Sequence, residues 1–136
     1  MILLDTSGLF AYLDKRDRHH QAVRAAMEAS RPPRLLSPFI LAEIDYLVTQ
    51  RIGQRAEMLL LDDVVSGAYR LEAFDAFALS EAREIMQRYA DLNVGLADAS
   101  VVVLAERFNA HDVLTLDTHF RALRAGGGAF RLLPAA

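Results

Sequence analysis

The sequence predicts an α/β fold in which a mostly parallel five-stranded sheet carries helices on both faces. Short apolar runs alternate along the chain with longer segments that have helical periodicity. The resulting order of strand, helix, strand is typical of parallel strands joined by helical crossovers. With 136 residues, the chain is long enough for one domain, expected to span 1–136, and too short for two.

Each element is placed by its own signals. Strands are expected at 2–5, 35–37, 70–74, 112–116 and 130–133, and helices at 7–15, 20–30, 38–51, 54–66, 80–90, 96–109 and 118–124. Ser37 and Pro38 fit the cap and first turn of the third helix, which Gly53 separates from the fourth. Ser80 is expected to open the fifth helix. The glycines 126–128 follow a helix, so they predict a turn into the last strand and not a phosphate-binding loop.

Composition excludes several classes of protein. Hydrophobic residues make up 53% and charged residues 24% of the chain, which is typical of a globular protein. No segment approaches the roughly 20 apolar residues that cross a bilayer, and the first apolar run is cut by Asp5, so neither a membrane location nor export is expected. We expect a cytoplasmic protein. Without cysteine, any metal must be held by acids and histidines.

The charge balance gives only weak information about a nucleic-acid partner. The net charge is −3, whereas phosphate binding usually leaves a basic surface. The positive charge comes from arginine except at Lys15, and arginine suits bidentate phosphate contacts. Genomic base composition also explains that bias, so charge alone does not decide the question.

The functional prediction rests on four acids that stand where apolar residues would be expected: Asp5, Glu43, Asp98 and Asp117. Asp5 and Asp117 end apolar strands, and in parallel sheets ligands bind beyond the carboxyl ends of the strands. Glu43 lies on the apolar face of the third helix and Asp98 in the first turn of the sixth, so both are expected to point inward. Carboxylates this close need a cation, and oxygen ligands favour Mg²⁺, with Mn²⁺ as a possible substitute.

Each acid also has a structural explanation. Asp5, Asp98 and Asp117 could cap helices, and Glu43 could pair with an arginine or face solvent. The histidines are mostly ordinary by position. His19 and His20 are expected on the surface and His111 in a turn, while His119, next to Asp117, could contact phosphate.

Four segments in a fixed order resemble the motifs of PIN-domain ribonucleases, specifically the VapC-type toxins of bacterial toxin–antitoxin pairs. The segments are MILLDTSGLFAYL at 1–13, LAEIDYLV at 41–48, YADLNVGLADASVVVLAERFN at 89–109 and VLTLDTHFRAL at 113–123. The resemblance implies a PIN-like fold and a metal-dependent endoribonuclease whose catalytic residues map onto the four acids. It implies that Asp5, Asp98 and Asp117 hold the metal, with Thr6, Ser7 and Thr115 as supporting hydroxyls. At Asn93 many relatives have proline, which concerns only the shape of a loop.

The same resemblance implies an RNA substrate, a cognate antitoxin and a homodimer. Leu47, Leu60 and Val64, in the apolar third and fourth helices, are the expected groove for the antitoxin. A phosphoreceiver domain is excluded because it needs an acidic pair after the first strand, and Leu4 precedes Asp5 here. A haloacid-dehalogenase phosphatase needs an aspartate where Ser7 stands. A non-catalytic binding module and a housekeeping PIN nuclease without an antitoxin remain as alternatives.

Overall fold

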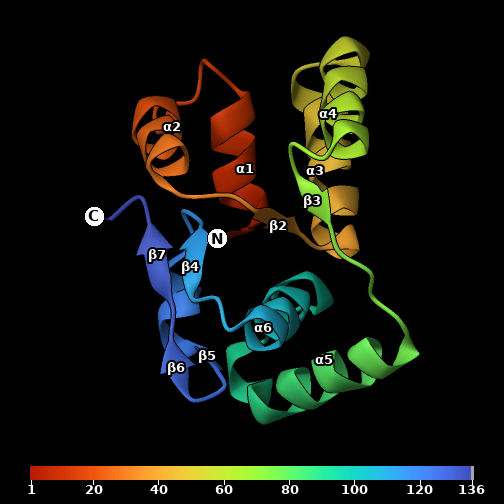
Figure 1. The fold of residues 1–136 in the computed structure, drawn as a ribbon, viewed down its shortest axis with the longest axis vertical. Helices are drawn as coiled ribbons and strands as arrows, with labels where there is room; N and C mark the ends of the chain where they lie inside the picture. The colour runs from red at the N-terminus through yellow and green to blue at the C-terminus, as the bar shows by residue number, and fades with distance from the viewer. Residues whose placement is uncertain (136) are drawn as a thin grey trace.

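The chain forms a five-stranded sheet with helices against both faces, which confirms the predicted fold class (Figure 1). The computed structural model describes residues 1–135. The elements in chain order are β1 (Ile2–Leu4), α1 (Thr6–Leu13), α2 (His20–Ala29), β2 (Arg34–Leu36), α3 (Pro38–Arg51), α4 (Gln54–Ser66), β3 (Arg70–Leu71), α5 (Ala76–Arg88), the 3₁₀ turn η1 (Ala90–Leu92), α6 (Leu96–Phe108), β4 (Asp112–Leu114), the 3₁₀ turn η2 (Thr118–Ala122), β5 (Arg124–Ala125), β6 (Gly128–Ala129) and β7 (Arg131–Leu133). Among residues 1–135, no helix is long and apolar enough to cross a membrane.

The strand order of the sheet is β3-β2-β1-β4-β7, and every neighbouring pair is parallel. Leu3 at the centre pairs with Leu35 on one side and Val113 on the other. Figure 1 shows α1 and α2 on one side of the sheet, α5 and α6 on the other, and the α3–α4 hairpin at the β2–β3 end. The chain leaves β1 toward β2 and later returns to β4 on the other side of β1. This switch of direction opens a crevice at the carboxyl ends of β1 and β4.

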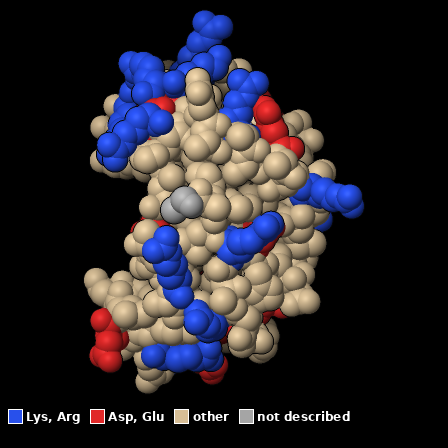
Figure 2. Space-filling model, turned by 90° about the vertical axis from the view of Figure 1, so that its left-hand side faces the viewer, with Lys and Arg blue, Asp and Glu red and all other residues tan. Residues whose placement is uncertain are grey.

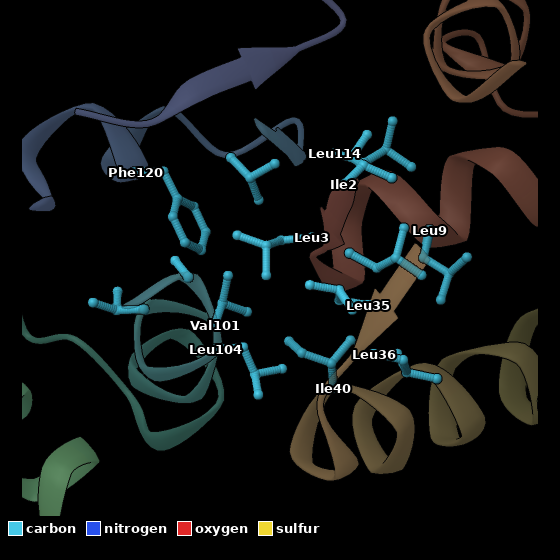
Figure 3. Close-up of a cluster of buried hydrophobic side chains, with 14 of the residues drawn as sticks. Ile2, Leu3, Leu9, Leu35, Leu36, Ile40, Val101, Leu104, Leu114 and Phe120 are labelled. Atoms are coloured by element: carbon cyan, nitrogen blue, oxygen red, sulfur yellow. The ribbon is translucent and has the colours of Figure 1, made fainter. Parts of the chain in front are cut away.

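The core lies on both faces of the central strands (Figure 3). Ile2, Leu3 and Leu4 are each at most 1% exposed, because the sheet is covered on both sides. This explains why β1 reads as a continuous apolar run and not as an alternating one. Leu9, Ile40, Leu104 and Phe120 add the helical and turn contributions to the same core.

The predicted helix starts are confirmed for α3 and wrong for α5. Ser37 Oγ accepts a hydrogen bond from the Phe39 amide at 3.1 Å, with Pro38 in the first turn. The fifth helix begins at Ala76 instead of Ser80, because Asp75 Oδ1 accepts a hydrogen bond from the Ala78 amide at 2.9 Å and caps it. Both residue types cap helices well, so the sequence alone did not choose between the two positions.

The region after β4 also differs from the prediction. The helix expected at 118–124 is the short 3₁₀ turn η2, and the chain then forms a hairpin in which β5 pairs antiparallel with β6. Gly126 and Gly127 turn this hairpin with φ of +55° and +81°, a backbone region that favours glycine. His111, expected in a turn, directly precedes β4 and contacts the hairpin: its Nε2 lies 3.0 Å from the Ala125 carbonyl oxygen.

Gly8 allows α1 to lie directly against the carboxyl end of β4. A Cβ built there would be 2.3 Å from the Leu114 carbonyl oxygen, which belongs to the backbone and cannot move aside cheaply. We therefore expect Gly8→Ala to lower the free energy of unfolding by about 1–3 kcal/mol through overpacking. Chemical denaturation measures this. Gly95→Ala is the control, since a Cβ at Gly95 meets no atom within 4 Å, and an equal loss in both variants would contradict the contact argument.

Candidate active site at the carboxyl ends of β1 and β4

The structure brings all four acids to the wall of one cavity of about 350 Å³. Asp5 directly follows β1, Asp117 lies just beyond β4, Glu43 lies on α3 and Asp98 in the first turn of α6. The parallel pairing of β1 with β4 places the first two side by side. The remaining lining residues are Thr6, Ser7, Phe10, Asp17, Leu47, Arg51 and Leu116.

Two hydroxyl groups hold the buried carboxylate of Asp5, which is 5% exposed. Thr115 Oγ1 donates to Asp5 Oδ2 at 2.6 Å, and Ser7 Oγ donates to the same oxygen at 3.1 Å. Each hydroxyl also accepts a backbone amide: Thr115 from Asp117 and Ser7 from Leu116, both at 2.9 Å. Asp5 occupies the N-cap position of α1 but makes no side-chain capping bond, so its structural explanation as a cap is wrong.

The carboxyl groups of Asp5 and Asp98 are both less acidic than usual. Burial raises the pKa of Asp5 and the hydrogen bond from Thr115 opposes it, while the nearby Asp98 raises it further. Burial also raises the pKa of Asp98, and His119 opposes this shift. The charged forms of both groups are therefore disfavoured in the folded chain unless a cation joins them.

Glu43 does not point inward as expected. It is exposed to solvent, and its Oε1 accepts a hydrogen bond from Thr6 Oγ1 at 2.6 Å. Thr6 therefore positions Glu43 at the open side of the cavity, whereas Ser7 and Thr115 support Asp5. The three predicted supporting hydroxyls therefore contact two different acids: Thr6 contacts Glu43, whereas Ser7 and Thr115 contact Asp5.

A buried hydroxyl pair ties together the helices that carry Glu43 and Asp98. Ser37 Oγ, at the cap of α3, lies 2.6 Å from Ser100 Oγ on α6, and both residues are 0% exposed. Ser100 also donates to the Ala97 carbonyl oxygen within α6 at 2.6 Å. Because α3 and α6 meet at this pair, it helps to fix the distance between Glu43 on α3 and Asp98 on α6.

His119 lies between two of the acids, which the sequence did not predict. Its Nδ1 is 2.5 Å from Asp117 Oδ1 and its Nε2 is 3.2 Å from Asp98 Oδ2. The second contact is an ion pair without hydrogen-bond geometry, so the buried Nε2 has no hydrogen-bond partner. Burial lowers the pKa of His119, but the Asp117 hydrogen bond and the charges of Asp98, Asp117 and Asp5 raise it above the ordinary value overall.

This imidazole lies where a cation would neutralise Asp98 and Asp117. Within residues 1–135, no three acidic or histidine side chains surround a single position closely enough to hold an ion. The sequence interpretation of His119 as a phosphate contact followed only from its place beside Asp117. Asp117 also accepts the His119 amide at 3.1 Å, so its structural explanation as a cap of η2 holds as well.

Phe10, Asp17, Arg51 and Leu116 also line the cavity and were not predicted from the sequence. The Arg51 guanidinium lies 5.4 Å from the centre of the Phe10 ring, at a distance typical of a cation–π contact. This places a positive charge on the wall of an otherwise acidic cavity. Arg51 ends α3 and Phe10 lies in the middle of α1, and no local pattern indicates that these positions meet.

The raised pKa of Asp98 predicts a stability change that depends on pH. A carboxyl group whose folded pKa exceeds its unfolded value of about 3.8 stabilises the fold at low pH, and this stability is lost as pH rises through the folded pKa. In metal-free buffer we therefore expect Asp98→Asn to raise the melting temperature at pH 7, with a gain that shrinks toward pH 4. Thermal melts across this range measure it. A variant less stable than wild type at pH 7 would contradict the conclusion that the charged form of Asp98 is disfavoured in the folded chain.

The matched control is Asp62→Asn, at an exposed position on α4. It removes the same charge from the chain without touching the cavity. Its melting temperature is expected to follow that of the wild type at every pH.

Comparison with known proteins places these features in a family. Residues 2–126 match the PIN domain family. The chain is 41% identical over 135 residues to Ribonuclease VapC26 of Mycobacterium tuberculosis, covering 98% of this chain and 100% of the relative. Among solved structures, VapC20 of M. tuberculosis superimposes with a TM-score of 0.84 at 22% identity, covering 95% of this chain and 99% of that one.

A second solved structure has the same fold in a complex. VapBC2 from Rickettsia felis, bound to a DNA fragment of its promoter, matches with a TM-score of 0.70 at 19% identity, covering 97% of this chain and 98% of that chain. The match to the family covers most of the chain, and the likeness to VapC26 extends over nearly its whole length. The chain therefore belongs to the PIN-domain family and is of the VapC type.

Proposed function

We propose that this chain is the toxin of a toxin–antitoxin pair, an endoribonuclease that hydrolyses RNA phosphodiester bonds with bound Mg²⁺, for which Mn²⁺ can substitute. The observation that carries the proposal is the convergence of the four predicted carboxylates, joined by Asp17, on one cavity at the carboxyl ends of β1 and β4. The identity to Ribonuclease VapC26 supports RNA as the substrate. VapC20, which shares the fold, is described as a toxin that cleaves the sarcin-ricin loop.

The donor set of the cavity fits a hard divalent cation. Only oxygen ligands are offered by Asp5, Asp98 and Asp117, and Mg²⁺ prefers such ligands. Asp5 is buried beside a second acid, and burial together with the charge of Asp98 raises its pKa although Thr115 and Ser7 donate hydrogen bonds to it. We assign Asp5, Asp98 and Asp117 to the metal, with His119 leaving its place between the last two. Bound metal would polarise the phosphodiester and lower the pKa of an attacking water.

The protein's own residues position the reactants. Ser7 and Thr115 keep the Asp5 carboxylate in one orientation through their hydrogen bonds to Oδ2. Glu43, held by Thr6 at the open side of the cavity, is the group we assign to orient the attacking water and accept its proton. This arrangement puts the proposed proton acceptor on α3 and the proposed metal ligands around the carboxyl ends of β1 and β4.

The antitoxin is assigned to apolar surface on the α3–α4 hairpin, with one correction. Leu60 is 1% exposed and belongs to the core, so its prediction as a groove residue is wrong. Leu47 and Val64 are half-buried, and the exposed apolar side chains of the hairpin include Leu59 and Val65, at 57% and 87% exposed. An amphipathic antitoxin segment would bury these residues. The similarity to the VapBC2 complex supports such a partner.

A homodimer is a further part of the proposal. Phe77 on α5 is 73% exposed, and a second copy of the chain would cover an aromatic side chain of this size. The mass in solution, measured by light scattering, decides between one and two copies.

We expect Asp5→Asn or Asp98→Asn to reduce RNA cleavage by at least about 100-fold with the fold intact, because each removes a carboxylate that binds the cation. Gel-based cleavage of total RNA at matched Mg²⁺ measures the loss, and circular dichroism checks the fold. Asp62→Asn, exposed on α4, is the control and should cleave as wild type does. Full activity in either cavity variant would refute the site assignment.

The same experiment tests the metal. A chelator should stop cleavage, and either Mg²⁺ or Mn²⁺ should restore it. Independently of activity, the metal should raise the melting temperature of the wild type, since it binds only the folded chain. At 100 times its dissociation constant, the metal should add about 2.7 kcal/mol to the free energy of unfolding. Asp98→Asn should lose this shift and Asp62→Asn should keep it. An unchanged melting temperature at saturating metal would count against a metal site.

Another prediction distinguishes a toxin from a housekeeping nuclease. Expression of the chain alone should arrest bacterial growth, and co-expression of the small protein encoded beside it should restore growth. Asp98→Asn should be harmless, which ties the arrest to the cavity. Leu59→Asp should remain toxic but escape the neighbouring protein, since a charge would interrupt the apolar surface of α4. Harmless expression of an active nuclease would favour the housekeeping alternative.

A further inference from the structure

A second hollow lies next to the acidic cavity and shares a wall with it. It has a volume of about 670 Å³. Leu116 lines both spaces, Thr115 and Asp117 lie on either side of it, and the segment at the end of β4 thus borders the two. The α1–α2 connection also borders both, through Asp17 in the cavity and His19 in the hollow. The two spaces are therefore neighbours, with Leu116 as their common wall.

The hollow differs from the cavity in charge. Arg121 and Arg131 line it together with His19, and no acid is among its lining residues within 1–135. Arg131 is already held by Asp112, through two hydrogen bonds of 2.9 and 2.7 Å. The exposed guanidinium of Arg121 makes no hydrogen bond or ion pair with any residue from 1 to 135, although its carbonyl oxygen accepts from Arg124 Nη1 at 3.0 Å.

The basic character extends to the edge of the hollow. Arg18 Nε donates to His19 Nε2 at 3.1 Å, which places a further guanidinium beside the His19 wall. Figure 2 shows this face of the molecule, on the side of α2 and the C-terminal strands, with basic side chains gathered above and below a hollow at its left-hand edge. Apolar residues complete the lining: Ala22, Leu116, Phe130, Leu132, Pro134 and Ala135.

Electrostatics explains why an acidic reaction centre needs such a neighbour. The carboxylates of the cavity repel a polyanion, and bound metal would offset this only at the phosphate that reacts. The phosphates next to it need their own cations, and a guanidinium without a partner is well suited to bind one. Arg121 is the unpaired cation in the hollow that adjoins the acids. The apolar floor offers a surface for the bases of an unpaired strand.

We propose that single-stranded RNA on one side of the scissile bond lies in this hollow, with Arg121 contacting a backbone phosphate. The inference rests on the proposed ribonuclease function and assigns it a substrate-binding surface. Arg51 on the wall of the acidic cavity provides a positive charge there as well, so the strand meets a guanidinium in each of the two spaces. An acidic segment of a partner protein is less favoured, since the hollow shares the Leu116 wall with the cavity that holds the proposed reacting groups.

The test measures binding separately from cleavage. A labelled oligouridine is titrated with the cleavage-deficient Asp98→Asn chain, and anisotropy gives the dissociation constant from 50 to 200 mM salt. Adding Arg121→Gln should weaken binding about fivefold at 0.1 M salt and reduce the slope of log affinity against log salt by about 0.7, the value for one lost phosphate contact. Arg121→Lys should keep most of the slope. Arg83→Gln, at an exposed position on α5, is the matched control and should change neither quantity.

The outcomes separate the inference from the proposed function. Equal binding by the Arg121→Gln and Arg83→Gln chains overturns the hollow as an RNA site, even when the wild type cleaves RNA. Weaker binding by Arg121→Gln alone supports the hollow, even when no RNA is cleaved and the ribonuclease proposal has failed. Loss of binding to the neighbouring small protein, with RNA binding unchanged, overturns the inference in favour of a protein interface. In the active chain, the supporting result is a higher KM with an unchanged kcat.

Discussion

The parallel pairing of β1 with β4 is the constraint on which the rest of the site depends. It places the end of one strand beside the end of another that lies more than 100 residues later, so that Thr115 reaches the buried carboxylate of Asp5. Gly8 makes this possible by allowing α1 to start against the backbone of Leu114. Every other feature of the cavity is arranged around Asp5, because a buried carboxylate is costly unless its hydrogen bonds and its charge are both satisfied.

The charge of the cluster is only partly satisfied by the folded chain. Hydroxyl groups orient Asp5, but they do not neutralise it, and the pKa values of Asp5 and Asp98 remain raised. His119 compensates on one side by lying between Asp98 and Asp117. Acids that are close together and only partly compensated lower the stability of the folded chain, and they raise the affinity of the site for a cation. This balance is expected where binding residues must remain available for a ligand.

Hydrogen bonds between helices set the remaining distances between the acids. The Ser37–Ser100 pair joins the start of α3 to α6 in the core, while Thr6 connects the start of α1 to Glu43 near the surface. Small polar side chains thus act as connectors between elements that carry acids. Their hydrogen bonds are worth about 1 kcal/mol each in stability, so their larger effect here is on the positions of the carboxylates.

The fold class, the parallel direction of most strands and the four predicted acids of the cavity could all be inferred from the sequence, but the order of the strands in the sheet could not. The inferred features follow from local patterns: apolar runs, helix periodicity, caps such as Ser37, and acids that interrupt apolar stretches. Four features became visible only in the folded chain: Glu43 is exposed, Leu60 is core, residues 118–125 form a 3₁₀ turn and a hairpin strand, and His119 lies between two acids. Rotation of a helix about its axis, and contacts between residues far apart in sequence, depend on how whole elements pack, and local patterns do not encode that packing.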